Sequence, residues 1–371
     1  MSLRGWCPGA LRPMMSGDGL VLRIRPHAGR LSVAQARAVA DLAQAHGNGR
    51  IDLGARAHLQ LRGVAEAALP ALWAALADLG LLDQDAGAEA RRNILTTPIH
   101  GADETLALVA ALEEGLRTGP DLPAKFGFAV DTGAAAVLGG ASADLRIERA
   151  ADGLILRAEG MARGEAVSAA QAVPRALEIA RWFAARRGAE TRIARLGLAP
   201  PLRAEQPPLT GAVLVPGATP FGLCIGLPFG QIGAQDLHRL ALAPLRLTPW
   251  RSVLLEGVAA ADLPPGLIRN AADPLLRVSA CTGAPGCASA TVETRALARR
   301  LAAGLPAGAT LHVSGCAKGC AHPRPADITL TGRDGAFDLI LNAGPAAAPL
   351  RRGLGPADIP DAIRGSLAPR L

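Results

Sequence analysis

The chain has 371 residues, of which 50% are apolar, 19% are charged and 3% are aromatic. This composition excludes disordered and coiled-coil proteins, and the length predicts two or three globular domains. The absence of tyrosine and the scarcity of other aromatic residues argue against a nucleic-acid binder that stacks bases. A formal net charge of +7 permits polyanionic partners without identifying one.

The longest stretch without charge, residues 206–235, is long enough to span a bilayer but contains five prolines. Proline interrupts a lipid-exposed helix, so we expect a linker followed by strands and turns. The N-terminus lacks the apolar core of a signal peptide, and six cysteines in a chain of this length do not form a disulfide scaffold. These features predict a cytoplasmic protein with reduced thiols and with no membrane or nucleic-acid partner.

Apolar periodicity predicts the elements of the first half of the chain. In chain order they are a helix at 32–45, an alternating strand at 50–64, a helix at 104–116, a strand at 125–130, a hairpin at 143–157 and a helix at 175–194. A proline-rich segment at 200–208 follows and marks the junction between two halves.

The second half repeats this order. Its predicted elements are a helix at 234–242, an alternating strand at 244–258, a helix at 291–305, a strand at 310–314 and a hairpin at 326–341. Blocks that recur in one order with similar spacing indicate an internal duplication. A duplicated α+β chain implies pseudo-twofold symmetry, and the cleft between its halves is a natural ligand site.

Four of the six cysteines form two close pairs near the C-terminus. Cys281 and Cys287 lie in CTGAPGC, and after 28 further residues Cys316 and Cys320 lie in SGCAKGC. Each pair sits in a loop of small residues after a predicted strand, where backbone N–H groups can approach a bulky inorganic core. Four thiolates from two loops can bind a [4Fe–4S] cluster.

Three alternatives stay open for these cysteines. Structural zinc favours pairs separated by roughly two to four residues, so the five between Cys281 and Cys287 are wide for it. Disulfides are uncommon in the cytosol, and inert buried cysteines do not usually pair beside glycine. The spacing favours a cluster over zinc, a disulfide or inert thiols. The first half of the chain has Leu95 and Pro98 near the corresponding positions.

Only two of the 39 basic residues are lysines, and they occupy corresponding parts of the two halves. Lys125 opens the strand at 125–130, and Lys318 lies between Cys316 and Cys320. A compact ammonium differs from a guanidinium in its protonation chemistry and its charge geometry, which favours a special role for both lysines. Chance placement at two surface positions is the alternative.

These motifs together resemble the sirohaem-dependent nitrite/sulfite reductase superfamily. CTGAPGC followed by SGCAKGCAHP is similar to its cluster motif, GARAHLQLRGV and ARRNI to two arginine motifs, and LPAKF to its lysine motif. The resemblance covers essentially the whole chain. It implies an α+β, internally duplicated fold with two ferredoxin-like half-domains and two α/β cluster-type domains in a pseudo-twofold arrangement.

On this resemblance the chain divides into five parts. They are an N-terminal arm at 1–14, a ferredoxin-like half-domain at 15–85, an α/β domain at 86–205, a second half-domain at 206–272 and an α/β cluster-binding domain at 273–371. The last part contains all four clustered cysteines, and the first α/β domain contains no cysteine.

Within the superfamily, the chain is most similar to the precorrin-3B synthase family. Its opening run CPGALRPMMSGDGLVLRIRP resembles the start of that family. The reductases carry a second lysine two positions after the first, whereas Lys125 is followed here by Phe126 and Gly127. Six-electron reduction of a small oxyanion needs several cations and proton donors, so the loss of one lysine favours the synthase. A sirohaem-dependent sulfite or nitrite reductase is the first alternative, and a non-catalytic tetrapyrrole or cluster carrier is the second.

The resemblance implies an oxidoreductase of cobalamin biosynthesis. It would act as a monooxygenase that uses dioxygen to hydroxylate precorrin-3A and closes a γ-lactone, giving precorrin-3B. The implied cofactors are a [4Fe–4S] cluster, a mononuclear non-haem iron and an external reductant, either NADH or a reduced electron carrier. The methyltransferase that acts next in the pathway is an implied protein partner.

The resemblance also implies roles for individual residues. A precorrin carries acetate and propionate carboxylates, for which arginine is the best bidentate partner. The expected substrate-binding residues are Arg56, Arg62, Arg92 and Lys125. The alternative is that these arginines face outward and do not bind substrate. The expected catalytic residues are Lys125 and Lys318.

Four further residues carry no firm assignment. His58 and His322 are candidate iron ligands or proton donors, but a lone histidine is more often a packed, hydrogen-bonded residue. Cys7 lies beside Pro8 and Gly9, where it could approach the substrate, and Cys224 has no assigned role.

Overall fold

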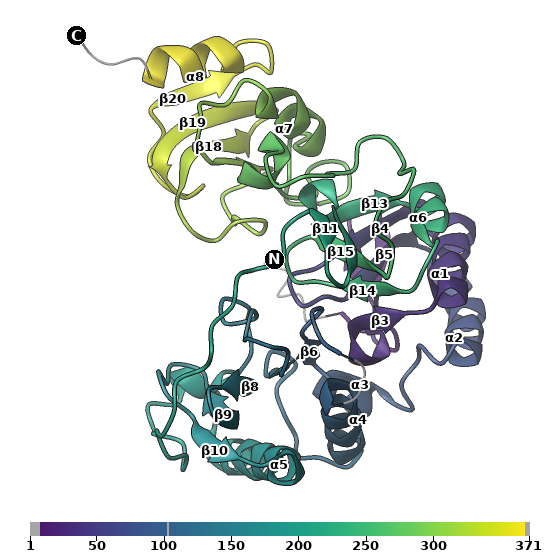
Figure 1. The fold of residues 1–371 in the computed structure, drawn as a ribbon. Helices are drawn as coiled ribbons and strands as arrows, with labels where there is room; N and C mark the ends of the chain where they lie inside the picture. Colours follow the sequence, from purple (N-terminus) through teal and green to yellow (C-terminus); the bar gives the residue numbers. More distant parts are fainter. Residues whose placement is uncertain (1–7, 102–103, 368–371) are drawn as a thin grey trace.

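The computed structural model describes residues 8–101 and 104–367. It contains four five-stranded sheets, and the two halves of the chain contribute to them in matching order. In Figure 1 the first α/β domain and the C-terminal α/β domain lie on opposite sides of a central body, which the two half-domains form. None of the helices in these described ranges is both long and apolar enough to cross a membrane.

The first half-domain is an antiparallel sheet with helices on one face. Its own strands are β1 (Met14–Ser16), β2 (Gly19–Ile24), β4 (Arg50–Leu53) and β5 (Leu59–Val64), and its helices are α1 (Val33–His46) and α2 (Leu69–Asp78). Helix α1 begins at a capping box, in which the Ser32 side chain and the Gln35 side chain each bind the other's backbone N–H. The predicted helix at 32–45 is therefore confirmed.

The second half-domain repeats this plan. Its own strands are β11 (Gly217–Thr219), β12 (Gly222–Gly226), β14 (Leu245–Leu247) and β15 (Ser252–Glu256), with helix α6 (Ala234–Leu240). Strands β11 and β12 lie within the uncharged stretch at 206–235, where the prolines predicted strands and turns rather than a membrane-spanning helix. Helices α1 and α6 lie side by side on the outer surface of the body (Figure 1).

The two half-domains exchange one short strand each. Strand β3 (Arg30–Leu31) pairs with β14 of the second sheet, and strand β13 (Gln231–Gly233) pairs with β4 of the first. Each exchanged strand follows a tight turn at a residue with positive φ, Ala28 at 51° and Phe229 at 59°. The sheet orders are accordingly β1-β2-β5-β4-β13 and β11-β12-β15-β14-β3, so neither sheet is complete without the other half.

The two α/β domains share one topology. The first contains β6 (Ile94–Thr96), β7 (Phe128–Asp131), β8 (Leu145–Ala150), β9 (Gly153–Ala158), β10 (Glu165–Val167), α3 (Ala86–Arg91), α4 (Glu104–Arg117) and α5 (Ala169–Arg186). The second contains β16 (Val278–Ala280), β17 (Leu311–Ser314), β18 (Ala326–Arg333), β19 (Ala336–Ala343), β20 (Arg351–Leu354), α7 (Arg295–Ala302) and α8 (Ile359–Leu367). In each sheet three strands pair in parallel and two antiparallel pairings follow, and this confirms the duplicated α+β fold.

Short 3-10 helices connect several of these elements. They are η1 (His27–Gly29), η2 (Glu66–Ala68), η3 (Ile193–Arg195), η4 (Pro228–Gly230) and η5 (Pro274–Arg277). Helices η1 and η4 are the turns that precede the exchanged strands.

Four predicted elements differ in the structure. The alternating segments at 50–64 and 244–258 are hairpins rather than single strands, each turning at a residue with positive φ, Ala57 at 54° and Arg251 at 56°. The helix expected at 175–194 runs from Ala169 to Arg186, because a Ser168–Gln171 capping box starts it earlier and Gly188, at φ 51°, follows its end. The helix expected at 291–305 is shorter, Arg295–Ala302.

The loop after β7 corresponds to the second cysteine loop of the other repeat, and a buried carboxylate organises it. Asp131 Oδ2 accepts hydrogen bonds from the backbone N–H groups of Val137 and Leu138, at 2.7 and 2.6 Å. Burial raises the pKa of Asp131 to about 6, although these N–H groups and the nearby Thr97 hydroxyl favour its ionised form. An aspartate thus anchors this loop without any cysteine.

The raised pKa predicts how the Asp131→Asn variant behaves. Because the folded pKa of about 6 exceeds the unfolded value of 3.8, ionised Asp131 costs stability, and this cost is absent at low pH and complete above the folded pKa. The amide of the variant carries no charge and keeps an oxygen acceptor. We therefore expect the free energy of unfolding of the variant, relative to that of the wild type, to rise by about 2 kcal/mol from pH 4 to pH 7.5. Urea unfolding of both proteins across this range measures the gain, and a difference that does not change with pH would contradict the assignment.

Candidate functional site

One face of the first half-domain sheet is polar. Four residues lie opposite one another across β2, β5, β4 and β13: Arg23, Gln60, Asp52 and Gln231. Because neighbours along a strand point to opposite faces, these four side chains share one face. Leu22 and Leu61 point to the other face and pack in the core beneath α1 and α2. The helices therefore leave the polar face to the two α/β domains.

Arginine side chains gather around a buried histidine at one end of this face. Arg25 directly follows β2, and His58 directly precedes β5. Burial holds the pKa of His58 well below its usual range, and the charges of Arg25, Arg23, Arg56 and Arg92 lower it further. His58 is therefore a neutral imidazole surrounded by four guanidinium groups.

Two atoms in this basic end are buried without a hydrogen-bond partner. They are Nε of Arg25 and Nδ1 of His58, and neither atom has a hydrogen-bond partner within residues 8–101 and 104–367. Burial also lowers the pKa of Arg25 to about 10, while a backbone carbonyl of Glu89 accepts a hydrogen bond from its Nη1. Buried polar atoms without partners are rare in native proteins, so these two atoms suit a bound ligand that supplies the missing partners.

Sequence reasoning missed Arg25. The signal was present, because the run Val21-Leu22-Arg23-Ile24-Arg25 alternates and places both arginines on one face of the predicted strand. What the sequence did not show was that this face lies against Arg56 and His58.

Arg56 and Lys125 are brought together by the structure. Arg56 lies in the β4–β5 turn and donates hydrogen bonds to the backbone carbonyls of Ala124 and Lys125, at 3.4 and 3.1 Å. The first half-domain thus contacts the LPAKF loop of the first α/β domain. The pairing agrees with the predicted neighbourhood, and the roles of both residues in binding substrate stay predictions.

Arg92 has a different environment from the one expected. It is 7% exposed, and its guanidinium donates two hydrogen bonds of 2.7 Å to the carboxylate of Asp83. It also contacts Glu113 at 3.4 Å and donates to the carbonyl of Arg25 at 2.8 Å. A substrate carboxylate would have to displace these partners. The predicted binding of substrate by Arg92 stays a prediction, and in the structure Arg92 joins Asp83 to the end of β2.

The four clustered cysteines converge on one region of the C-terminal domain. Burial raises the pKa of the Cys320 thiol, and the neighbouring thiols Cys316, Cys281 and Cys287 raise it further. The backbone N–H of Gly315 donates a hydrogen bond of 3.1 Å to Sγ of Cys281. Four thiols from two loops, three of which lie near enough to act on Cys320, fit the ligand set of an iron–sulfur cluster, and an N–H donor at one sulfur adds to the fit.

A single metal ion fits these residues less well. No three Cys, His, Asp or Glu side chains within 8–101 and 104–367 form a group that could hold one ion. A zinc ion draws its thiolates to within about 2.3 Å of one point, whereas a cube of four irons binds each thiolate at a separate corner. The arrangement therefore favours the cluster over the zinc alternative, and among the described cysteines none forms a disulfide.

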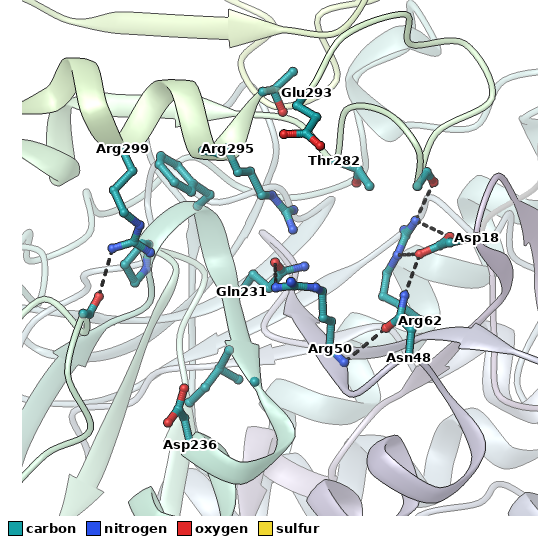
Figure 2. A pocket seen from close by; sticks show the side chains of 18 of the residues that line it. Asp18, Asn48, Arg50, Arg62, Gln231, Asp236, Thr282, Glu293, Arg295 and Arg299 are labelled. Atoms are coloured by element: carbon teal, nitrogen blue, oxygen red, sulfur yellow. Dashed lines mark hydrogen bonds and ion pairs between the residues drawn. The ribbon is translucent and has the colours of Figure 1, made fainter.

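A cavity of about 630 Å³ borders the first cysteine loop. Its walls come from the polar sheet face, from α7 and from the loop between Cys281 and Cys287. Figure 2 shows Arg295 reaching from α7 toward Gln231 and Arg50, with Arg62 and Asp18 along one side. The cavity thus joins the cysteine region to the polar face, and a concave space of this size can hold a small molecule.

Arg62 lines this cavity and has several protein partners. It donates to Asp18 at 2.7 and 3.2 Å, to Ser16 Oγ at 3.1 Å and to the carbonyl of Gly286 at 2.8 Å. Lys318 lies on the other cysteine loop and donates to Ser289 Oγ at 2.8 Å. The predicted contacts of these two residues with substrate stay predictions.

The remaining candidates have packed environments. His322 contacts the ring of His312, with ring centroids 5.7 Å apart, and burial lowers the pKa of His312 to about 4, with His322 and Arg251 adding to the effect. Cys224 is buried, and burial raises the pKa of its thiol to about 11, which makes it a poor nucleophile at neutral pH. Cys7 lies outside the described residues.

The Arg92–Asp83 pair yields a prediction on stability. Replacing Arg92 by alanine leaves a buried carboxylate without its partner, so Arg92→Ala should lower the free energy of unfolding by about 3 kcal/mol. Adding Asp83→Asn should restore part of this loss, because the amide carries no charge. Urea unfolding of the single and double variants measures both effects, and equal losses in the two proteins would contradict a structural pairing.

Comparisons with known proteins agree with this architecture. Residues 12–79 match the family model of the nitrite/sulfite reductase ferredoxin-like half domain. A precorrin-3B synthase from Sinorhizobium sp is 30% identical over 95% of this chain and 87% of its own length. A ferredoxin–nitrite reductase from Synechococcus elongatus is 27% identical over 97% of this chain and 88% of its own length.

A solved structure shares the fold. The NirA protein of Mycobacterium tuberculosis superposes with a TM-score of 0.57, covering 93% of this chain and 79% of that one, at 20% sequence identity. This likeness confirms the predicted nitrite/sulfite reductase-like architecture. With the identity to the Sinorhizobium enzyme over nearly the whole chain, it follows that the chain belongs to the precorrin-3B synthase family, on the duplicated fold of the nitrite and sulfite reductases.

Proposed function

We propose that this protein converts precorrin-3A to precorrin-3B in the cytoplasm, by dioxygen-dependent hydroxylation and γ-lactone formation. One atom of dioxygen becomes the hydroxyl oxygen and the other leaves as water, which consumes two electrons from an external reductant and two protons. The observation that carries the proposal is the arginine-rich sheet face beside four convergent cysteines, in a chain of this family.

The basic end of the sheet face supports the choice of substrate. Precorrin carboxylates need charged donors, and each charge-assisted hydrogen bond contributes about 1.5–3 kcal/mol. Arg25, Arg56 and Lys125 are the contacts we place first, because Nε of Arg25 is buried without a partner and Arg56 binds the Lys125 carbonyl. Arg62 and Arg92 would join them only by exchanging Asp18 and Asp83 for substrate carboxylates.

Cys281, Cys287, Cys316 and Cys320 are the residues that would hold a [4Fe–4S] cluster. When bound, such a cluster would supply one-electron transfer from the external reductant, NADH or a reduced carrier, to the site of oxygen chemistry. The chain's own residues bind and orient the macrocycle, and Lys125 and Lys318 are the proposed proton donors. A mononuclear iron, and delivery of product to the next methyltransferase, belong to the proposal through the family resemblance alone.

The cluster assignment predicts the behaviour of a Cys316→Ser variant. Removing one thiolate from a four-thiolate site should abolish the cluster, because serine is a weak ligand for iron. We expect iron and acid-labile sulfide to fall to background after anaerobic purification, and the brown colour to disappear. Cys224→Ser is the matched control, since that buried thiol lies in the second half-domain sheet, and it should retain full iron content. Unchanged iron in Cys316→Ser would remove the assignment.

The reaction predicts the source of the oxygen. Protein supplied with precorrin-3A, a reductant and isotopically labelled dioxygen should form a lactone product with one labelled oxygen, detected by mass spectrometry. Product without label would exclude a monooxygenase. Extractable sirohaem together with reductant-linked consumption of sulfite or nitrite would instead establish a reductase, and tight precorrin binding without turnover would indicate a carrier.

A further inference from the structure

The first cysteine loop is held from outside its own domain. Ser16 Oγ of strand β1 donates a hydrogen bond of 2.9 Å to the carbonyl of Gly286, the residue before Cys287. The Arg62 Nη2 atom donates to the same carbonyl at 2.8 Å. Two residues of the first half-domain thus bind one backbone atom beside a predicted cluster ligand.

The close approach at this contact depends on glycine. A Cβ at Gly17, in the β1–β2 turn, would lie 2.7 Å from the Pro285 carbonyl oxygen and 2.9 Å from the Ala288 nitrogen. Real Cβ atoms do not approach backbone atoms so closely, so only glycine lets the turn touch the loop on both sides of Cys287. The turn and the loop are therefore in direct backbone contact.

Arg62 is itself fixed by two carboxylates. Asp18 accepts from its Nη2 and Nε atoms at 2.7 and 3.2 Å, and Asp52 Oδ2 lies 3.8 Å from Nε. The Arg62 side chain is 8% exposed, so water screens these interactions little. A planar guanidinium paired in this way has one orientation in which it can reach the Gly286 carbonyl.

Asp52 extends the network to the other end of the same loop. Its Oδ1 atom accepts from Gln231 Nε2 at 2.9 Å and from Arg295 Nη1 at 3.1 Å. Thr294, the neighbour of Arg295 at the start of α7, donates from Oγ1 to the carbonyl of Cys281 at 2.7 Å. The loop is thus tied at Cys281 through α7 and at Gly286 through Arg62, and both ties lead to Asp52.

We propose that Arg62, oriented by Asp18 and Asp52, is a positioning residue. Through its hydrogen bond to the Gly286 carbonyl it holds the Cys281–Cys287 loop against the sheet face. The cluster and the substrate face are then held at a fixed separation by half-domain side chains, not by the C-terminal domain alone. The proposal rests on the cluster function proposed above. Arg62 acts here through the protein backbone, whether or not substrate also contacts its remaining donor.

The test compares Arg62→Gln with Arg50→Gln. Arg50 lines the same cavity, but among the described residues its side chain makes one long hydrogen bond, of 3.3 Å to Gln231, and none to the cysteine loop. In protein without metal, alkylation of Cys287 is followed by mass spectrometry, with Cys224 as an internal reference. After anaerobic reconstitution, iron and sulfide are counted and the electron paramagnetic resonance spectrum of the reduced cluster is recorded.

We expect Arg62→Gln to alkylate at Cys287 at least fivefold faster than wild type and to give an altered or broadened resonance. Arg62→Lys should give an alkylation rate between those of the wild type and Arg62→Gln. Its ammonium keeps the charge but lacks the planar set of N–H donors of a guanidinium. Arg50→Gln should match the wild type in both measurements. If Arg62→Gln does not fold, as judged by circular dichroism, Ser16→Ala removes one bond to the Gly286 carbonyl and should raise alkylation of Cys287 to a smaller extent.

Two results separate this inference from the function on which it rests. Alkylation and resonance in Arg62→Gln that equal those of Arg50→Gln would overturn the positioning role while leaving the cluster intact. Wild-type protein that binds no iron or sulfide would overturn the cluster, and the alkylation rates would still decide whether Arg62 holds the loop.

Discussion

The exchange of β3 and β13 between the half-domains is the constraint on which the rest of the structure depends. It completes both five-stranded sheets and fixes one against the other. Gln231 enters the first sheet on the exchanged strand and binds Asp52, so the exchange also builds a wall of the cavity. The two α/β domains then attach to this pair of joined sheets. Arg56 contacts one of them at the LPAKF loop, and Arg62 contacts the other at the first cysteine loop.

The two sheets have diverged in chemistry while keeping one geometry. Arg23 and Arg25 precede the turn at η1, and the positions that precede η4 in the second half-domain are occupied by Cys224 and Gly226. The α/β domains diverged in the same way, because a loop anchored by Asp131 in one corresponds to a cysteine loop in the other. Each pair of equivalent modules therefore carries different chemical groups at corresponding positions of one fold.

Much of this organisation follows from local sequence. Apolar periodicity, the cysteine spacing and the recurring blocks are short-range signals, and they predicted the element order, the duplication and the convergence of four thiols. Features that arise from tertiary contacts were not predictable in this way. The strand exchange, the burial of Arg92 against Asp83 and the gathering of Arg25 with His58 depend on which segments meet. The hairpin turn at Ala57 was not predicted, because positive φ is usually signalled by glycine and here an alanine adopts it.

The strand exchange also bears on the origin of the chain. A protein of half this length would lack the edge strand that its sheet needs, and it would acquire one only from a second copy of itself. The ancestor implied by this geometry is a homodimer with swapped edges, later joined head to tail by gene fusion. Once joined, the two copies could change independently, so four cysteines occupy the loops of one α/β domain while a buried aspartate, Asp131, anchors the corresponding loop of the other.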